Sequence, residues 1–221
     1  MIVSIHQPNF FPYYGYFDKI NVSDIFVFLD NVTYSKESFT NRNRIKTPKG
    51  QAWLTVPLNK KGILEKEIKN VTISNTIDWR TAHMNLIHEN YVHSKYYRQY
   101  ENIINSIYKK EWHNLSDLNI FITETLAQLF NIGGTFIRAS ELDVHGKKET
   151  LIPEICKAVG ADVYYCGISG RKYNDNLHFE KYDIKIIYQN IKHPIYQQLY
   201  GDFLSNLSII DLIFNMGVDL Y

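Results

Sequence analysis

IVSIHQPNFFPYYGYFDKINVSDIFVFLD, residues 2–30, is the stretch that decides the fold. Its two ends, Ile2–His6 and Ile25–Leu29, are apolar runs of the length of buried strands, and Tyr13–Asn21 between them has the length of a short helix. Two strands joined by a helix form a βαβ unit, in which the strands run parallel. The segment therefore predicts an α/β protein with a parallel or mixed sheet.

The rest of the chain predicts one α/β domain over residues 1–221 with a helical insertion around residues 79–131. Apolar stripes with helical spacing indicate three helices in that insertion. Further strands are expected at Gln51–Leu58, Glu65–Ile73, Thr135–Ala139, Ala161–Cys166 and Ile184–Tyr188, and a further helix over residues 151–159. Ser208 and Asp211 have the spacing of a capping box for a last helix that stops near Gly217.

Composition excludes several classes of protein. The 221 residues are 45% hydrophobic, and the formal net charge is only +1, so disorder and binding driven by overall charge to nucleic acid or to a membrane are not expected. No segment has the pattern of a signal peptide or the length of a membrane span, which predicts a cytoplasmic protein. The two cysteines, Cys156 and Cys166, fall in apolar segments and are expected to be buried thiols.

Polar residues follow the first two strands at the positions where they end. His6, Gln7 and Asn9 follow the first strand, and Asp30 follows the second. Ligands of open α/β sheets bind beyond the carboxyl ends of the strands, and histidine exchanges protons near neutral pH. We therefore expect His6 and Asp30 to lie side by side as catalytic residues, with Gln7 and Asn9 contacting the substrate. A buried, hydrogen-bonded histidine that only caps the strand end is the structural alternative.

A basic loop follows Asp30. Residues 36–49 contain five basic residues and one acidic residue, Glu37. Arginine forms two parallel hydrogen bonds to phosphate or carboxylate, and hydroxyl and amide side chains are interleaved with the basic ones. A solvated basic loop is the plain alternative, but the position at a strand end favours an anion site. The residues expected to bind the anion are Lys36, Ser38, Thr40, Asn41, Arg42 and Arg44.

Two further segments are weaker candidates for substrate contact. The loop 167–173 follows a strand, and its Gly167, Ser169 and Arg171 are expected to approach a ligand, together with Lys172. His193 precedes Pro194, and the sequence leaves open whether His6 or His193 is the catalytic histidine. His88 and His93 are five positions apart rather than three or four, so no bound metal is expected.

The turn Pro12-Tyr13-Tyr14-Gly15-Tyr16 lies between the first strand and its helix, where backbone N–H groups favour phosphate. Its placement is similar to the His-x-Gly-His signature of nucleotidyltransferases, with Tyr14 and Tyr16 in the places of the histidines. This resemblance implies a Rossmann-like start of the nucleotidyltransferase type and a substrate contact for Tyr16. Packing of the tyrosines on the first helix is the alternative.

Four longer motifs resemble the WbqC-like family. They are IHQPNFFPYYGYFDKI (5–20), SKESFTNRNRIKTPKGQAWLTVP (35–57), HPIYQQ (193–198) and FLSNLSIIDLIFNMG (203–217), and the resemblance runs from residue 2 to residue 217. Ser140-Glu141-Leu142 departs from the family pattern, in which two serines are expected. The resemblance implies a bacterial protein encoded among O-antigen or other surface-polysaccharide genes.

The resemblance further implies a transferase that places an acyl or aminoacyl unit, such as glycyl, on the amino group of a nucleotide-linked amino sugar. No tightly bound cofactor is expected, but the reaction would use either ATP with Mg²⁺, to activate a free acid as the donor, or an acyl thioester as the donor. The alternatives are a nucleotidyltransferase that activates a sugar phosphate, and a sugar-nucleotide-binding protein without activity. Expected partners exclude nucleic acid and membranes, and a homodimer is compatible with the sequence.

Overall fold

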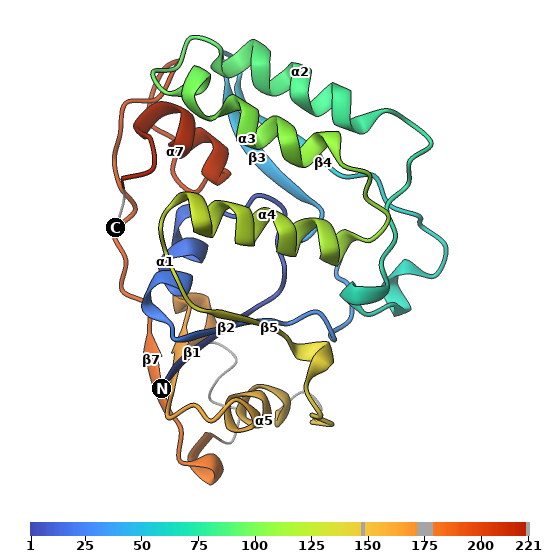
Figure 1. Cartoon of the computed structure of the whole chain (residues 1–221), viewed down its shortest axis with the longest axis vertical. Helices are drawn as coiled ribbons and strands as arrows, with labels where there is room; N and C mark the ends of the chain where they lie inside the picture. The colour runs from blue at the N-terminus through green and yellow to red at the C-terminus, as the bar shows by residue number, and fades with distance from the viewer. Residues whose placement is uncertain (147–148, 172–178, 220–221) are drawn as a thin grey trace.

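A parallel five-stranded sheet forms the lower half of the molecule as drawn in Figure 1. The computed structural model describes residues 1–146, 149–171 and 179–219. The strand order is β5-β2-β1-β6-β7, and all four neighbouring pairs are parallel. The strands are β1 (Ile2–His6), β2 (Ile25–Phe28), β5 (Thr135–Arg138), β6 (Val163–Cys166) and β7 (Lys185–Tyr188). The predicted α/β class and βαβ start are confirmed.

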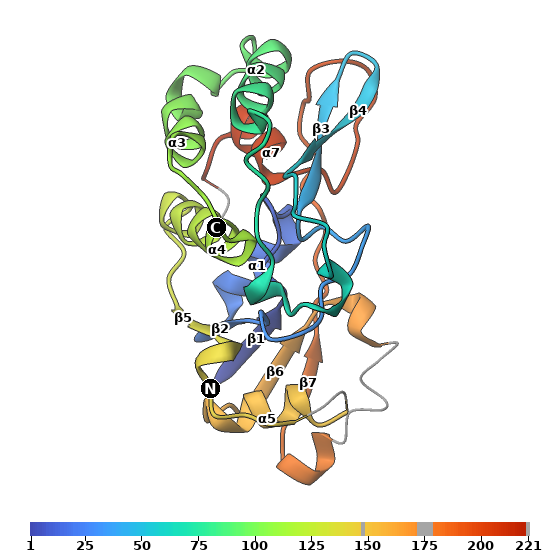
Figure 2. The same cartoon turned by 90° about the vertical axis from the view of Figure 1, so that its right-hand side faces the viewer.

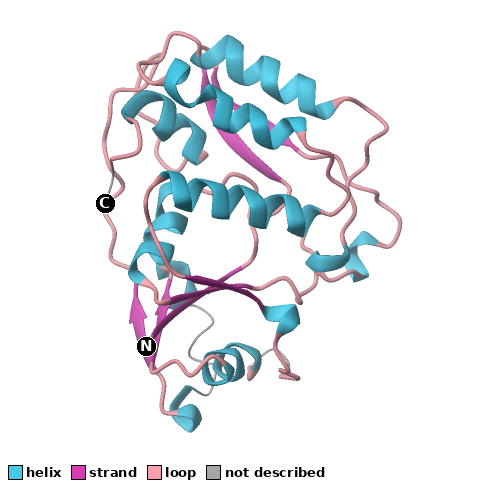
Figure 3. Ribbon diagram, in the orientation of Figure 1, coloured by secondary structure: helices cyan, strands magenta, loops and turns pink. Residues whose placement is uncertain are grey.

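Helices cover both faces of this sheet. Figures 1 and 3 show α1 (Tyr14–Val22) and α4 (Leu115–Leu129) on one face and α5 (Leu151–Ala158) on the other. Successive side chains of a strand point to opposite faces, so Phe26 and Phe28 join the core beneath α1 and α4. Val3 and Val27 join the core beneath α5. His6 and Tyr16, from β1 and α1, lie against each other on the α1 face.

The upper half consists of helices and a two-stranded ribbon. The other α-helices in the described residues are α2 (Trp79–Tyr91), α3 (Tyr97–Lys109) and α7 (Ile209–Met216). Figure 2 shows the antiparallel ribbon of β3 (Arg42–Thr47) and β4 (Gly50–Thr55) apart from the main sheet, beside α2 and α7. Helices α2, α3 and α4 confirm the three helices expected between residues 79 and 131. In the part of the chain that the structure describes, no helix is long and apolar enough to cross a membrane.

Side-chain caps explain where three of these helices begin. The side chains of Asp78, Asn114 and Ser208 accept backbone N–H hydrogen bonds at the starts of α2, α4 and α7. Ser208 therefore caps the last helix as expected. Asp211 does not complete the predicted capping box, because its carboxylate accepts hydrogen bonds from other parts of the chain.

Two other predictions about local structure were wrong. Part of the expected basic loop, from Arg42 onward, is strand β3, in which Asn43 and Ile45 are buried while Arg42 and Arg44 are partly exposed. The basic residues hide this alternation in the sequence. The segment Glu65–Ile73 is not the expected strand. Short 3₁₀ turns occur there instead, at Ile63–Glu65 and Ile68–Asn70. Other 3₁₀ turns are Ala139–Glu141, Ile168–Gly170 and Phe179–Tyr182.

The strand order creates a crevice next to His6. Chain direction across the sheet changes at β1, because β2 lies on one side of it and β6 on the other. The helix α1, which follows β1, lies on one face of the sheet, whereas the turn Phe179–Tyr182, which follows β6, packs against α5 on the other face. The chain therefore leaves β1 and β6 toward opposite faces. Such a divergence is where ligands bind in open α/β sheets.

Candidate functional site

A cavity of about 330 Å³ opens at this crevice. Four segments that are distant in sequence contribute to it: the end of β1 with the loop that follows, the start of β3 with the segment that precedes it, the turn after β6, and the segment before α7. Its lining residues are His6, Asn9, Pro12, Tyr13, Phe39, Asn43, Arg44, Ser169 and Asn206. The structure therefore brings four of the predicted site residues together, namely His6, Asn9, Arg44 and Ser169.

His6 is held with one ring nitrogen available to the cavity. Its Nδ1 lies 3.0 Å from the carbonyl oxygen of Gln7. A carbonyl oxygen only accepts hydrogen bonds, so Nδ1 carries the hydrogen and Nε2 keeps a lone pair. The Tyr16 ring contacts the imidazole edge to face at 4.8 Å, and its hydroxyl donates to the same Gln7 carbonyl at 3.1 Å. These contacts fix the orientation and the tautomer of His6.

The environment keeps His6 uncharged. Burial lowers its pKa to about 3, and the nearby ammonium group of Lys19 contributes to this lowering. The hydrogen bond to Gln7 acts in the opposite direction but is the smaller effect. At neutral pH the imidazole is therefore a hydrogen-bond acceptor at Nε2 and can receive a proton from a strongly acidic group.

Lys19 is a feature of the site that the sequence analysis missed. It lies on α1, is only 2% exposed, and its ammonium group is 5.5 Å from the centre of the Tyr16 ring. Burial lowers the pKa of Lys19 to about 8, against the opposing effects of Cys166 and Asp18. The sequence carries only a weak sign of this burial, because Lys19 lies near the apolar Phe17 and Ile20 of a short helix.

Arg44 supplies the positive charge of the cavity. Its Nη1 donates to Gln51 at 3.0 Å, and its guanidinium group lies 5.7 Å from the Phe39 ring and 5.5 Å from the Trp53 ring. Its Nε is buried without a hydrogen-bond partner in the described parts of the chain. No described carboxylate forms an ion pair with Arg44, so its charge is available to an anion.

Buried amides hold the two main loops of the site in place. The Asn119 amide, on α4, donates to the carbonyls of Pro8 at 2.9 Å and Thr40 at 2.7 Å. The Asn43 amide donates to the carbonyl of Phe11 at 2.7 Å. Phe11 has a φ of 40°, a left-handed conformation that strains a residue with a side chain. These bonds and the complete burial of its ring maintain that conformation.

A second cavity of about 350 Å³ adjoins the first and shares Tyr13 and Asn206 with it. Tyr14, Gly15 and His193 are among its other lining residues. The Nδ1 of His193 lies 2.9 Å from the carbonyl of Pro194, so it carries the hydrogen, and Nε2 lies 3.4 Å from the donating backbone N–H of Asn206. Both nitrogens of His193 are thus occupied, which favours His6 as the proton acceptor.

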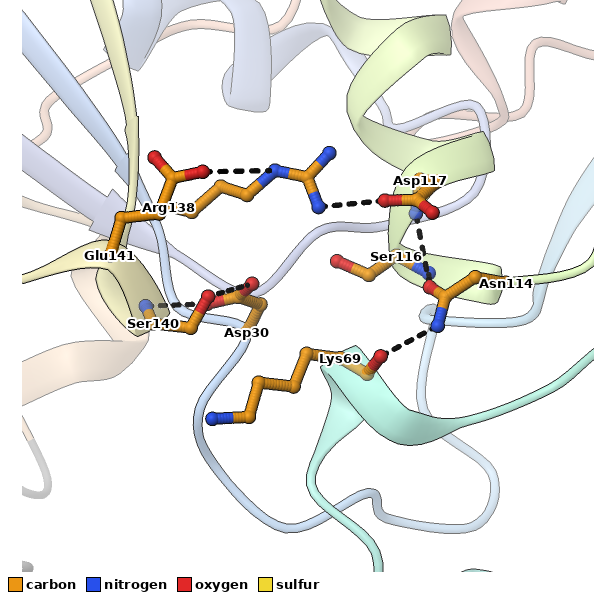
Figure 4. A network of polar contacts seen from close by, with 8 residues as sticks. All are labelled: Asp30, Lys69, Asn114, Ser116, Asp117, Arg138, Ser140 and Glu141. Carbon is orange, nitrogen blue, oxygen red and sulfur yellow. Dashed lines mark hydrogen bonds and ion pairs between the residues drawn. The ribbon is translucent and has the colours of Figure 1, made fainter.

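Asp30 does not lie at this cavity, contrary to expectation. Figure 4 shows its carboxylate directed toward Ser140, whose backbone N–H donates to Oδ1 at 2.9 Å and whose hydroxyl donates to Oδ2 at 2.8 Å. Asp30 is completely buried. A separate set of contacts beside it, also drawn in Figure 4, joins Arg138 to Asp117 and Glu141. Asp30 therefore attaches the end of β2 to the turn after β5 rather than facing His6.

Other predicted residues are distributed around the site. Lys36 and Asn41 line a separate and larger cavity of about 570 Å³, whose other lining residues come mainly from segments 55–58 and 62–65. The Ser38 hydroxyl donates to Thr40, which is buried. Arg42 stacks on Trp53, and Arg171 lies 4.8 Å from the centre of the Tyr188 ring. Gly167 begins the turn that carries Ser169, whereas Lys172 and Tyr173 fall outside the described residues.

Among the described residues, no group of three or more His, Cys, Asp or Glu side chains has the arrangement of a metal site. The polar groups at the crevice are a neutral imidazole, a guanidinium group, carboxamides and the start of α1. These groups suit an anionic small molecule with a polar acceptor group. Fold and site together define an α/β protein with a ligand crevice at the carboxyl ends of its parallel strands.

Comparison with known proteins gives the family. The model of the WbqC-like protein family matches residues 7–220, and the chain belongs to this family. It is 32% identical to "Uncharacterized protein Rv1507c" of Mycobacterium tuberculosis over 219 residues, which cover 98% of this chain and 94% of that protein. No solved structure matches the chain.

Proposed function

We propose that this protein is a transferase that forms an amide on the amino group of a nucleotide-linked amino sugar, as a step in surface-polysaccharide synthesis. The observation that carries the proposal is that the neutral His6 imidazole and the Arg44 guanidinium line one cavity of about 330 Å³. The first provides a proton acceptor and the second an anion contact. Both are needed for a charged substrate that reacts through an amine.

In the proposed reaction the uncharged amine of the sugar attacks the carbonyl carbon of an acyl donor. A C–N bond forms, and the nitrogen of the tetrahedral adduct becomes positively charged and strongly acidic. Nε2 of His6 takes the proton from this nitrogen. Because the charged nitrogen of the adduct is more acidic than that of a free ammonium ion, a weakly basic imidazole is sufficient. The C–S or C–O bond to the leaving group then breaks, and the leaving group receives the proton. A thioester donor reacts directly, whereas a free acid must first be activated by ATP.

The surroundings of α1 support a site for negative charge. Its N-cap residue Tyr13 forms no side-chain cap. Tyr13 lines both of the adjoining cavities, and Gly15 lines the second. The start of a helix carries partial positive charge. An oxyanion formed near Gly15 would be stabilised there, while Arg44 would bind the diphosphate of the sugar nucleotide.

The geometry is less favourable to a nucleotidyltransferase. The resemblance to the His-x-Gly-His signature requires Tyr16 to contact phosphate, but Tyr16 is completely buried beneath His6 and its hydroxyl donates to Gln7. Only Tyr14 of the two tyrosines lines a cavity. Amide formation needs no contact from Tyr16, which is why we favour it.

The test is to incubate the protein with a dTDP-linked amino sugar, together with either glycine and ATP or a glycyl thioester, and to measure the mass of the product. We expect a product heavier by one glycyl unit. His6→Gln should lower the rate by about 10²–10⁴-fold, the usual contribution of a general base. His145→Gln is the matched control, because His145 is highly exposed and pairs with the equally exposed Asp143. Binding of the sugar nucleotide with no product from either donor would reject the transferase in favour of a binding protein.

A further inference from the structure

The face of the β3–β4 ribbon beside the His6 cavity carries planar side chains that are partly open to solvent. We call Phe39, Arg42, Arg44 and Trp53 the stacking platform. The Arg42 guanidinium lies 4.4 Å from the Trp53 ring centre, and the Phe39 and Trp53 rings are 6.1 Å apart at an angle of 35°. Arg44 pairs with Trp53 across the ribbon and lies near both rings.

The platform has features that a purely structural cluster lacks. Phe39 is 41% exposed and Trp53 is 42% exposed, although burial of aromatic rings strongly stabilises a fold. The Nε atoms of Arg42 and Arg44 are buried and have no hydrogen-bond partner among the residues that the structure describes. Neither arginine forms an ion pair with a described carboxylate. Two cations that no described carboxylate neutralises therefore lie against aromatic rings that are partly open to solvent.

We propose that the stacking platform binds the nucleoside diphosphate part of a ligand, with the base against Trp53 and Phe39 and the diphosphate on Arg42 and Arg44. This inference rests on the proposed function and specifies which part of the protein recognises the nucleotide. Aromatic rings stack on any nucleobase, and guanidinium groups bind phosphate through paired hydrogen bonds. A free sugar would contact the rings but would leave both cations unneutralised.

The position of the platform connects it to the reacting group. Phe39 and Arg44 belong to the platform and also line the His6 cavity. That cavity, at about 330 Å³, is at the small end of the range for ligand sites, so it accommodates the sugar and the platform accommodates the nucleotide. The diphosphate on Arg44 then lies between the two parts, as it does in a sugar nucleotide.

The experiment is equilibrium binding of UDP, ADP, uridine and pyrophosphate, without any acyl donor, by calorimetry and tryptophan fluorescence. We expect the nucleoside diphosphates to bind more tightly than either uridine or pyrophosphate. Trp53→Ala should weaken UDP binding at least about tenfold and leave pyrophosphate binding unchanged, and Trp53→Phe should retain most of the affinity. UDP should quench the fluorescence of the protein and of Trp112→Phe, the matched control, but not of Trp53→Phe. Unchanged thermal unfolding of each variant shows that folding is intact.

Several results would overturn the inference. UDP binding no tighter than pyrophosphate binding, or unchanged in Trp53→Ala, shows that the platform does not hold a base. Tighter binding of a short oligouridylate than of UDP identifies the platform as a single-stranded nucleic-acid site instead. The binding assay contains no donor, so its result does not depend on the proposed reaction. UDP binding in this assay, together with no product in the amide assay, rejects only the proposed reaction. Amide formation on an amino sugar without detectable UDP binding rejects only the platform.

Discussion

Asp211, at the start of the last helix, accepts a hydrogen bond of 2.7 Å from the hydroxyl of Tyr91, which lies 120 residues earlier at the end of α2. The Tyr91 hydroxyl in turn accepts the backbone N–H of Lys46 in β3 at 2.9 Å. The other oxygen of Asp211 accepts from the Tyr196 hydroxyl and the Gln198 amide, each at 2.8 Å. A single buried carboxylate thus joins α2, the ribbon and the segment that leads to Asn206 at the cavity.

We predict that Asp211→Asn destabilises the protein by about 1–3 kcal/mol, because a buried amide nitrogen would then face donors that it cannot accept from. Urea unfolding measures this change. Asp202→Asn is the control, since residue 202 is exposed and its backbone carbonyl, which Lys46 contacts, is retained. Equal stability of the two variants would contradict the role assigned to Asp211.

The titration of His6 should depend on Lys19. Removing the ammonium group in Lys19→Met removes a like charge, so we expect the pKa of His6 to rise from about 3 while staying below 6.5, because burial is the larger cause of its lowering. NMR of the imidazole across pH measures this directly. Lys49→Met, a substitution of an exposed lysine, should leave the titration unchanged. A His6 pKa unaffected by Lys19→Met would show that the two groups are not coupled.

Acid should destabilise the fold through its neutral histidines. Burial lowers the pKa of His6 to about 3 and that of His83 to about 4, whereas unfolded histidine titrates near 6.5. Between these pH values the unfolded chain binds more protons than the folded protein. The contribution of the neutral histidines to the free energy of unfolding is therefore fully present above about pH 6.5 and is lost as the pH falls toward 4. Each histidine contributes up to about 1.4 kcal/mol per pH unit in this window. His83→Leu should reduce the difference in unfolding free energy between pH 7.5 and pH 5; the same difference as in the unsubstituted protein would argue against it.

Asn119→Leu should weaken ligand binding without touching the cavity. It leaves the carbonyls of Pro8 and Thr40 without their buried donor, at a cost of about 1–3 kcal/mol in stability. We expect lower affinity for the sugar nucleotide, because the loop after His6 and the loop before β3, which carries Arg44, are no longer joined through α4. Asn102→Leu, at an exposed position of α3, serves as the control for the same chemical change. If Asn119→Leu is less stable but binds the sugar nucleotide with full affinity, Asn119 stabilises the fold without positioning the site, and the prediction is contradicted.

Much of the fold was predictable because the decisive signals are local. Residues 2–30 indicated two parallel strands and a helix from apolar runs alone, and the helices of residues 79–131 followed from their stripes. Strand β3 was not predictable in the same way, because its basic residues suggest a solvated loop. In the structure, Arg42 and Arg44 lie near the Trp53 ring of the neighbouring strand β4. The 3₁₀ turns at residues 63–70 retain buried Ile63 and Ile68, which resemble the apolar positions of a strand.

The site was predictable only in part, because it depends on directions of side chains. The placement of His6 and Ser169 follows from the positions where β1 and β6 end. The direction of Asp30 toward Ser140 depends on β5 pairing with β2 on the side away from β1, which the sequence does not reveal. Lys19 was missed because an isolated lysine in a short helix is normally exposed, and only the packing of α1 on β1 and β6 buries it.

The double hydrogen bond of Asn119 has a consequence for how specificity can change among relatives. The loops next to His6 and Arg44 are attached to the same helix in the absence of substrate. Binding therefore requires little ordering of the backbone and costs little conformational entropy. Differences in substrate between members of the family are then expected to arise by exchange of individual side chains around a rigid frame, rather than by remodelling of loops.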